Sequence, residues 1–133
     1  MQKNTARFGT LEYREEDVIS ITGGLIGFGY LTSFVLVQHK PESPFQWLQS
    51  LDDGDTAFLV ADPCALVPGY APAISDHEAS ELGLVENAPV FLLSTVSIPQ
   101  SRPQDLTINL AAPIVVNATS KIGKQVVLEG DAY

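Results

Sequence analysis

The side chains that most often bind metals or perform catalysis are few in this chain and widely spaced. His39, His77 and Cys64 are its only imidazole and thiol groups. Their separations match no zinc-ligand spacing, and a single cysteine leaves no thiol pair for a metal. Ser75, Asp76 and His77 are the residue types of a hydrolytic triad, but sequence neighbours cannot stack in line, and the G-x-S-x-G elbow is absent. We therefore expect no metal site, no cofactor and no catalytic residue.

Two further segments resemble ligand-binding loops only in part. Asp52, Asp53 and Asp55 have the charge of a calcium loop, but the glycine position and the distal glutamate of an EF-hand are missing. Residues 23–29, with the sequence GGLIGFG, match neither phosphate-binding pattern, and no basic residue follows them. We interpret the aspartates as a polar hairpin tip and the glycines as a turn with close backbone approaches.

The charge balance indicates which class of partner the protein could bind. Sixteen acidic residues oppose seven basic ones, for a net charge of −9 at pH 7. This charge disfavours nucleic acid, because a grip on the phosphate backbone needs clustered lysine and arginine. A basic protein would instead be attracted, at a rate that falls as salt rises. Solubility alone is the other explanation of the acidic excess.

The sequence also indicates the cellular compartment of the protein. One cysteine excludes an internal disulfide and fits a reducing compartment. The first residues lack the apolar core of a signal peptide, and no run of about 18 apolar residues occurs. We therefore expect a soluble cytoplasmic protein with no membrane partner.

Short apolar runs between clusters of Gly, Pro and Asp predict an all-β fold, since this spacing is typical of small β-sandwiches and barrels. The clearest predicted strands are residues 34–39, 45–51, 57–62, 90–98, 114–117 and 125–129. Weaker candidates are residues 5–8, 11–13 and 18–21.

The tryptophan-containing strand and its successor should form a hairpin. Phe45, Trp47 and Leu51 fall on one face of an extended chain, and we expect that face to be buried. Residues 57–61 show no alternation, which predicts a central strand covered on both sides. Between the two strands, the sequence DDGD supplies a turn in which Gly54 is free to adopt positive φ.

One short helix is predicted near residues 75–83. Ser75 and Glu78 have the capping-box spacing, in which the serine oxygen accepts from the glutamate amide and the glutamate reaches back. Gly83 stands where a helix normally stops. Residues 65–73, which contain two prolines, should be a loop.

The C-terminal third contains an extended stretch, residues 107–117, that is interrupted by a proline. Pro113 cannot donate to a ladder, so it marks a strand start, an edge or a bulge. Backbone groups left unpaired there would suit a partner strand or helix, which makes Thr107, Asn109 and Pro113 candidate anchors. The alternative is that Asn109 satisfies only local backbone groups.

Several stretches, in order along nearly the whole chain, resemble the flagellar assembly factor FliW family. They are RFG at 7–9, GLIGF at 24–28, SPFQWLQSLDD at 43–53, FLVADP at 58–63, ELGL at 81–84, TINLAAPIVVN at 107–117 and GKQVVLE at 123–129. The resemblance implies a single domain over residues 1–133. That domain would be a small, mainly antiparallel, β-barrel-like protein without enzymatic activity.

The resemblance also implies two protein partners. FliW proteins bind flagellin before export, and they bind CsrA, a basic RNA-binding repressor of translation. Free FliW sequesters CsrA and thereby releases flagellin mRNA for translation. The candidate contacts to a cationic surface are then Asp52, Asp53 and Asp55. A run of large apolar side chains is usually interior, so we expect the core of a barrel wall to contain Phe45, Trp47, Leu51 and Phe58, with direct partner contact as the alternative.

A second hypothesis comes from another class of function. A small β-barrel that binds a metabolite or performs an unrecognised hydrolysis would account for the Gly-rich loop and the lone cysteine. Ligand-dependent stabilisation in a thermal-shift screen would separate this hypothesis from the first.

Overall fold

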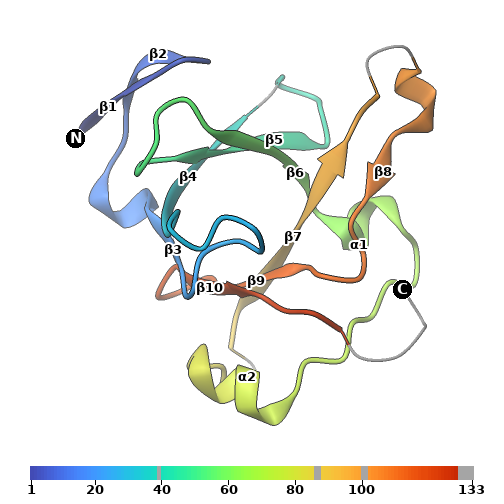
Figure 1. Cartoon of the computed structure of the whole chain (residues 1–133). Coiled ribbons are helices and arrows are strands. Elements are labelled where there is room, and N and C mark those ends of the chain that lie inside the picture. Colours follow the sequence, from blue (N-terminus) through green and yellow to red (C-terminus); the bar gives the residue numbers. More distant parts are fainter. Residues whose placement is uncertain (39, 86–87, 100–101, 129–133) are drawn as a thin grey trace.

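The Val-, Ile- and Phe-rich runs form strands that wrap into a closed barrel (Figure 1). The computed structural model describes residues 1–38, 40–85, 88–99 and 102–128. The strands are β1 (Gln2–Thr5), β2 (Gly9–Glu12), β3 (Ile19–Ile21), β4 (Ser33–Gln38), β5 (Phe45–Ser50), β6 (Ala57–Ala61), β7 (Val90–Ser97), β8 (Thr107–Ile108), β9 (Ile114–Asn117) and β10 (Ile122–Gln125). The helices are α1 (Pro63–Leu66), α2 (Asp76–Glu81) and the 3₁₀ turns η1 (Glu15–Asp17) and η2 (Pro103–Asp105).

The pairing of the strands closes the sheet on itself. Hydrogen-bonded neighbours follow the order β6-β5-β4-β3-β10-β9-β7, and a pairing of β7 with β6 completes the ring. All these pairs are antiparallel except β3 with β10, which is parallel. β8 adds to β7 outside the ring, and β1 and β2 form a separate hairpin. The predicted all-β, mainly antiparallel barrel is confirmed.

The interior of the barrel is filled by large apolar side chains. Because side chains alternate between the two faces of a strand, every second residue points inward. The buried cluster consists of Ile19, Ile21, Leu25, Leu31, Phe34, Leu48, Val60, Leu93, Ile114 and Val116. Burying one such side chain contributes about 1.5–3 kcal/mol, so this cluster supplies much of the stability.

The face of β5 that points into the barrel is the opposite of the face predicted from the sequence. Leu48 is fully buried in the core cluster, whereas Phe45 and Trp47 are half-buried on the outer face. There the guanidinium of Arg7 lies 3.8 Å from the centre of the Trp47 ring. The prediction that Phe45 and Trp47 build the core is therefore wrong, whereas Phe58 does pack against it.

The polar residues of the inner face of β5 explain this difference. Gln46 and Ser50 lie at the two ends of the strand, near the mouths of the barrel, where polar atoms find partners. The Ser50 hydroxyl accepts hydrogen bonds from the amides of Asp52 and Asp53, at 3.1 and 2.9 Å. A satisfied hydroxyl can be buried at little cost, so Leu48 takes the centre of the face.

Two predicted strands differ most from the structure. The last strand is Ile122–Gln125 rather than 125–129, and residue 129 lies outside the described residues. The ladder stops because Pro113 has no amide proton, although its carbonyl still accepts from the Val126 amide at 2.9 Å. Near the N-terminus, residues 6–8 form a turn rather than a strand, because the Thr5 hydroxyl accepts from the Phe8 amide at 2.9 Å.

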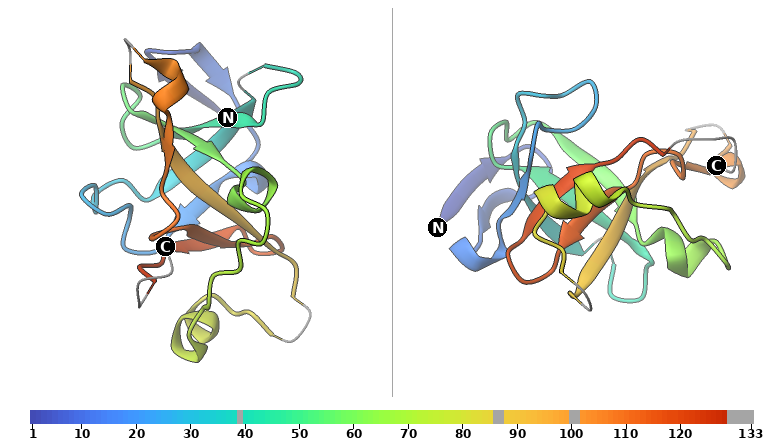
Figure 2. Two further views of the ribbon diagram at one scale, coloured as in Figure 1. Left: turned by 90° about the vertical axis from the view of Figure 1, so that its right-hand side faces the viewer. Right: turned by 90° about the horizontal axis from the view of Figure 1, so that it is seen from below.

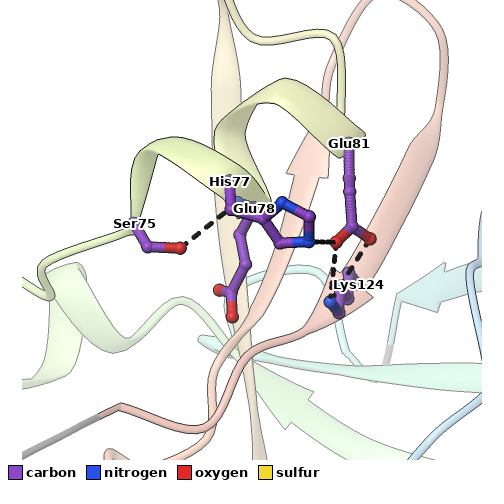
Figure 3. A network of polar contacts seen from close by, with 5 residues as sticks. All are labelled: Ser75, His77, Glu78, Glu81 and Lys124. Atoms are coloured by element: carbon purple, nitrogen blue, oxygen red, sulfur yellow. Dashed lines mark hydrogen bonds and ion pairs between the residues drawn. The ribbon is translucent and has the colours of Figure 1, made fainter.

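The predicted helix is present as α2. The Ser75 hydroxyl accepts from the Glu78 amide at 3.2 Å, which is the serine half of the capping box. Figure 3 shows Glu81 between two partners, with His77 Nε2 at 2.7 Å and Lys124 Nζ at 3.3 Å. The second of these contacts joins the helix to β10.

A second apolar cluster packs the α2 region against the outside of the barrel. Leu82, Val115 and Val126 are buried there. The Asn117 amide nitrogen donates to the Leu82 carbonyl at 3.0 Å, which satisfies an acceptor at the end of α2.

Helix α1 occupies part of the segment that was predicted to be a loop. The Asp62 carboxylate accepts from the Cys64 amide at 2.9 Å, and Pro63 takes the first helical position. Both are ordinary signals of a helix start, so the sequence did contain evidence for this turn.

Candidate functional site

Two loops project from one end of the barrel. One is residues 51–56, here called the acidic hairpin, and the other is residues 22–32, here called the aromatic loop. The pairing of Phe34 with Ser50 places both at the same end, and the left-hand view of Figure 2 shows them on one side. Asp52 Oδ2 joins them by accepting from the amides of Thr32 and Ser33, at 2.8 and 2.9 Å.

The three aspartates of the acidic hairpin have different roles. Asp52 links the two loops. Asp53 accepts from the Asp55 amide at 3.0 Å and from the Thr56 hydroxyl at 2.9 Å, so it shapes the turn. Asp55 is exposed and accepts no hydrogen bond from the described residues. Its carboxylate is therefore the one most available to a partner.

Gly54 is required for a different reason from the expected one. It does not adopt positive φ. A Cβ at this position would lie 2.1 Å from the carbonyl oxygen of Asn4, because the β1–β2 hairpin packs closely against the turn. The Ala6 amide donates to the Gly54 carbonyl at 3.0 Å.

The hydrogen bonds of the turn act on the charge of Asp53. The Asp55 amide, with a smaller effect from the Thr56 hydroxyl, lowers the pKa of Asp53 below its usual value, and the nearby Lys3 ammonium adds to this. Such a group stabilises the fold fully above its unfolded-state pKa of about 3.9, and the contribution is lost as the pH falls through the lower folded-state pKa.

We expect Asp53→Asn to reduce stability at pH 7 and to make progressively less difference below about pH 4. The reason is that protonation removes the same charge from the wild-type hairpin. Urea unfolding midpoints at neutral and acidic pH measure the effect. Asp55→Asn is the matched control, and a constant difference between Asp53→Asn and the wild type at every pH would contradict the expectation.

The predicted anchors Thr107, Asn109 and Pro113 have different surroundings. Thr107 belongs to β8, across the barrel from the acidic hairpin (Figure 1). Asn109 Oδ1 accepts from the Ala112 amide at 3.1 Å, which is the local role weighed as the alternative. Pro113 is fully buried and immediately precedes β9, which fits the predicted strand start.

Many backbone acceptors of this stretch already have partners within the protein. The Leu110 carbonyl accepts from the Tyr70 hydroxyl at 2.6 Å. The Ala111 carbonyl accepts from the Leu128 amide at 2.8 Å, and the Ala112 carbonyl accepts from Gln125 Nε2 at 3.0 Å. A role for residues 107–113 as anchors stays a prediction. Its support is weaker than the sequence suggested, because fewer backbone groups are left unpaired.

The aromatic loop contains exposed residues that the sequence reasoning did not select. Ile26, Phe28 and Tyr30 are 58%, 37% and 70% exposed. The glycines around them do make the expected close approach: a Cβ on Gly24 would lie 2.7 Å from Gly29 Cα. The sequence pattern that could have indicated them is the alternation of large apolar residues with glycines. When the glycines are considered alone, this pattern indicates only a turn.

The remaining candidate groups offer little chemistry. Burial, together with the neighbouring Asp62 carboxylate, raises the pKa of the Cys64 thiol, so the thiol is protonated at neutral pH. Among the described residues, no three His, Cys, Asp or Glu side chains are placed to hold a metal, and His39 lies outside them. The Gly-rich loop and the cysteine thus give no support to hydrolysis.

A cleft of about 320 Å³ lies at the opposite end of the barrel from the aromatic loop. Ile19, Leu36 and Phe91 contribute apolar surface to it, and Asp17 and Lys121 contribute charge. This volume is at the low end of the range for small-molecule sites.

Comparison with known proteins identifies the family. The FliW family model, described as "FliW protein", matches residues 2–133. The chain belongs to the FliW family. The flagellar assembly factor FliW of Syntrophus aciditrophicus (strain SB) is 43% identical over 133 residues, which is 100% of this chain and 84% of that protein. The FliW of Desulfitobacterium hafniense (strain Y51) is 41% identical over 135 residues, covering 100% of this chain and 87% of its own.

A solved FliW structure shares the fold. It is described as the crystal structure of the flagellar assembly factor FliW, and it superposes with a TM-score of 0.89 at 30% identity, over 100% of this chain and 92% of that one. FliW membership supports a role in flagellar assembly. No helix within the described ranges is long and apolar enough to cross a membrane.

Proposed function

We propose that this FliW-family protein is a non-enzymatic regulator of flagellar assembly that acts in the bacterial cytoplasm. It binds flagellin and the basic repressor CsrA, and its binding of CsrA relieves the repression of flagellin mRNA translation. The observation that carries the proposal is the match of the FliW family model to residues 2–133. The net charge of −9 supports a basic partner independently.

The barrel suits a protein that acts by binding. A closed ring of strands is rigid, so the loops at its ends are held in place before a partner arrives, and less entropy is lost on association. The field of the acidic residues steers a cationic partner toward the surface. Flagellin and CsrA then influence each other, because both bind one limited pool of this protein. They either compete for it or occupy it together.

We expect the association rate constant with purified CsrA to fall about tenfold between about 20 mM and about 300 mM NaCl, with less than about a threefold change in the dissociation rate constant. Long-range attraction accelerates encounter and is screened by salt. Stopped-flow or biolayer interferometry measures both constants. A salt-independent association rate would contradict the electrostatic part of the proposal.

Two further outcomes complete this test. Asp55→Lys reverses one charge without removing a hydrogen bond, and it should slow association at low salt. An absence of binding at micromolar concentrations in low salt would reject the CsrA half of the proposal, and the same measurement with flagellin would decide the other half.

A further inference from the structure

We propose that Ile26, Phe28 and Tyr30 form the apolar anchor of a docking surface for a basic protein, with the acidic hairpin as its charged rim. These three residues are called the loop patch below. The inference rests on the proposed function and assigns the site that CsrA would occupy. Its three anchor residues lie outside the acidic hairpin and outside the 107–113 stretch.

The loop patch is mounted on the barrel core by a series of aromatic rings. Tyr30 and Phe28 have ring centres 6.4 Å apart, and Phe28 meets Phe58 edge to face at 5.1 Å. Phe58 in turn lies 6.3 Å from Phe34, which is fully buried. A partner that contacts Tyr30 therefore meets a side chain supported by packing down to the interior.

Hydrogen bonds hold the backbone of the aromatic loop as well. The Ile26 amide donates to Gln125 Oε1 at 2.8 Å, and Gln125 Nε2 donates to the Ala112 carbonyl at 3.0 Å, so the loop is tied to β10 and to the residue before Pro113. Within the loop, the Phe28 amide donates to the Leu25 carbonyl at 2.7 Å. A loop fixed in this way loses little freedom on binding, which favours affinity.

The composition of the loop patch is that of a binding hot spot. Tyrosine and phenylalanine are enriched at the centres of protein interfaces, where a few desolvated side chains supply most of the affinity. Leu25, by contrast, turns inward and is buried in the core cluster. The same loop therefore contains a residue that serves the fold, together with three residues that are 37–70% exposed.

The charge beside the loop patch selects its occupant. Asp52 bonds to the amide of Thr32, two residues beyond Tyr30, and the exposed Asp55 lies in the same hairpin. A second copy of this chain would bring a further charge of −9 to the contact, and an anionic lipid surface or nucleic acid would also be repelled. A cationic protein surface with exposed apolar side chains satisfies both parts of the site.

The test is a double substitution, Ile26→Ser with Tyr30→Ser, which leaves Phe28 in its contact with Phe58. We expect the dissociation constant for CsrA to rise at least about 30-fold, because hot-spot truncations cost about 2 kcal/mol or more. The matched control is Val85→Ser with Val127→Ser, two exposed valines outside the aromatic loop, with an expected change below about threefold. Urea unfolding and circular dichroism of both double variants establish that they remain folded.

Each outcome of this experiment has a distinct meaning. If the wild-type chain binds CsrA and the loop variant binds equally well, the docking surface is wrong and the proposed function stands. If the wild-type chain does not bind CsrA in low salt, the CsrA half of the proposed function fails and this inference fails with it. Sedimentation that shows a wild-type dimer dissolved by the loop substitutions would assign the loop patch to a second copy and overturn the proposal.

Discussion

Leu48→Ala is expected to lower the free energy of unfolding by about 3–5 kcal/mol. Leu48 is fully buried at the centre of the inner face of β5, where Leu36 and Phe58 are its partners on the neighbouring strands. Truncation there removes apolar contacts and leaves a cavity that paired strands on both sides cannot collapse to fill. Domains of this size are stable by only about 5–15 kcal/mol, so the loss is a large share of the total.

Leu59→Ala is the matched control, because Leu59 lies opposite Trp47 on the adjacent strand and faces outward. It is half-buried, so we expect a cost of about 1 kcal/mol. Urea unfolding followed by tryptophan fluorescence measures both variants. Equal costs for the two leucines would mean that the inner and outer faces of the barrel wall have been assigned wrongly.

Gly24→Ala is expected to destabilise the protein by about 3 kcal/mol or more, through two separate effects. The first is conformational, since Gly24 has a φ of +69°, a region that costs a residue with a side chain about 1–2 kcal/mol. The second is steric. A Cβ would lie 2.7 Å from Gly29 Cα, Gly29 O and Phe28 O, all of them backbone atoms. The aromatic loop would have to open to admit it.

Gly23→Ala separates the two effects. Gly23 has a similar φ of +76°, but a Cβ there meets nothing within 4 Å. We expect this variant to show only the conformational cost of about 1–2 kcal/mol. Unfolding midpoints compare the stabilities, and CsrA binding by the folded fraction reports on the loop patch. If both glycine variants lost the same stability and the same affinity, the close approach inside the loop would have no consequence.

Local patterns in the sequence were sufficient for the class of fold and for α2. Alternating apolar runs with Gly and Pro between them specify strands, and the Ser75 cap with Gly83 specifies a short helix, because each signal acts within a few residues. The orientation of β5 was not accessible in this way. Both of its faces carry bulky residues, and the choice of Leu48 over Trp47 depends on partners from other strands and on where Ser50 and Gln46 meet the barrel mouths.

The candidate site also has features that were predictable from local sequence and features that were not. The turn at residues 52–55 was predictable from its Asp and Gly residues. The requirement for glycine at position 54 was not, because it is imposed by the Asn4 carbonyl of the distant β1–β2 hairpin. The sequence only weakly indicated the exposure of Ile26, Phe28 and Tyr30, because large apolar residues are usually interior. Only the closed barrel shows that Leu25 fills the available space and leaves its neighbours outside.

The parallel pairing of β3 with β10 has a consequence for biosynthesis. Ser20 pairs with Ile122, about 100 residues later in the chain. At elongation rates of about 5–20 residues per second, the first ring strand is made roughly 5–20 s before the strand that seals it. Throughout that interval the growing chain carries an open sheet with unsatisfied edges, so the barrel cannot close before β10 has been made, and nascent chains are most vulnerable to aggregation until then.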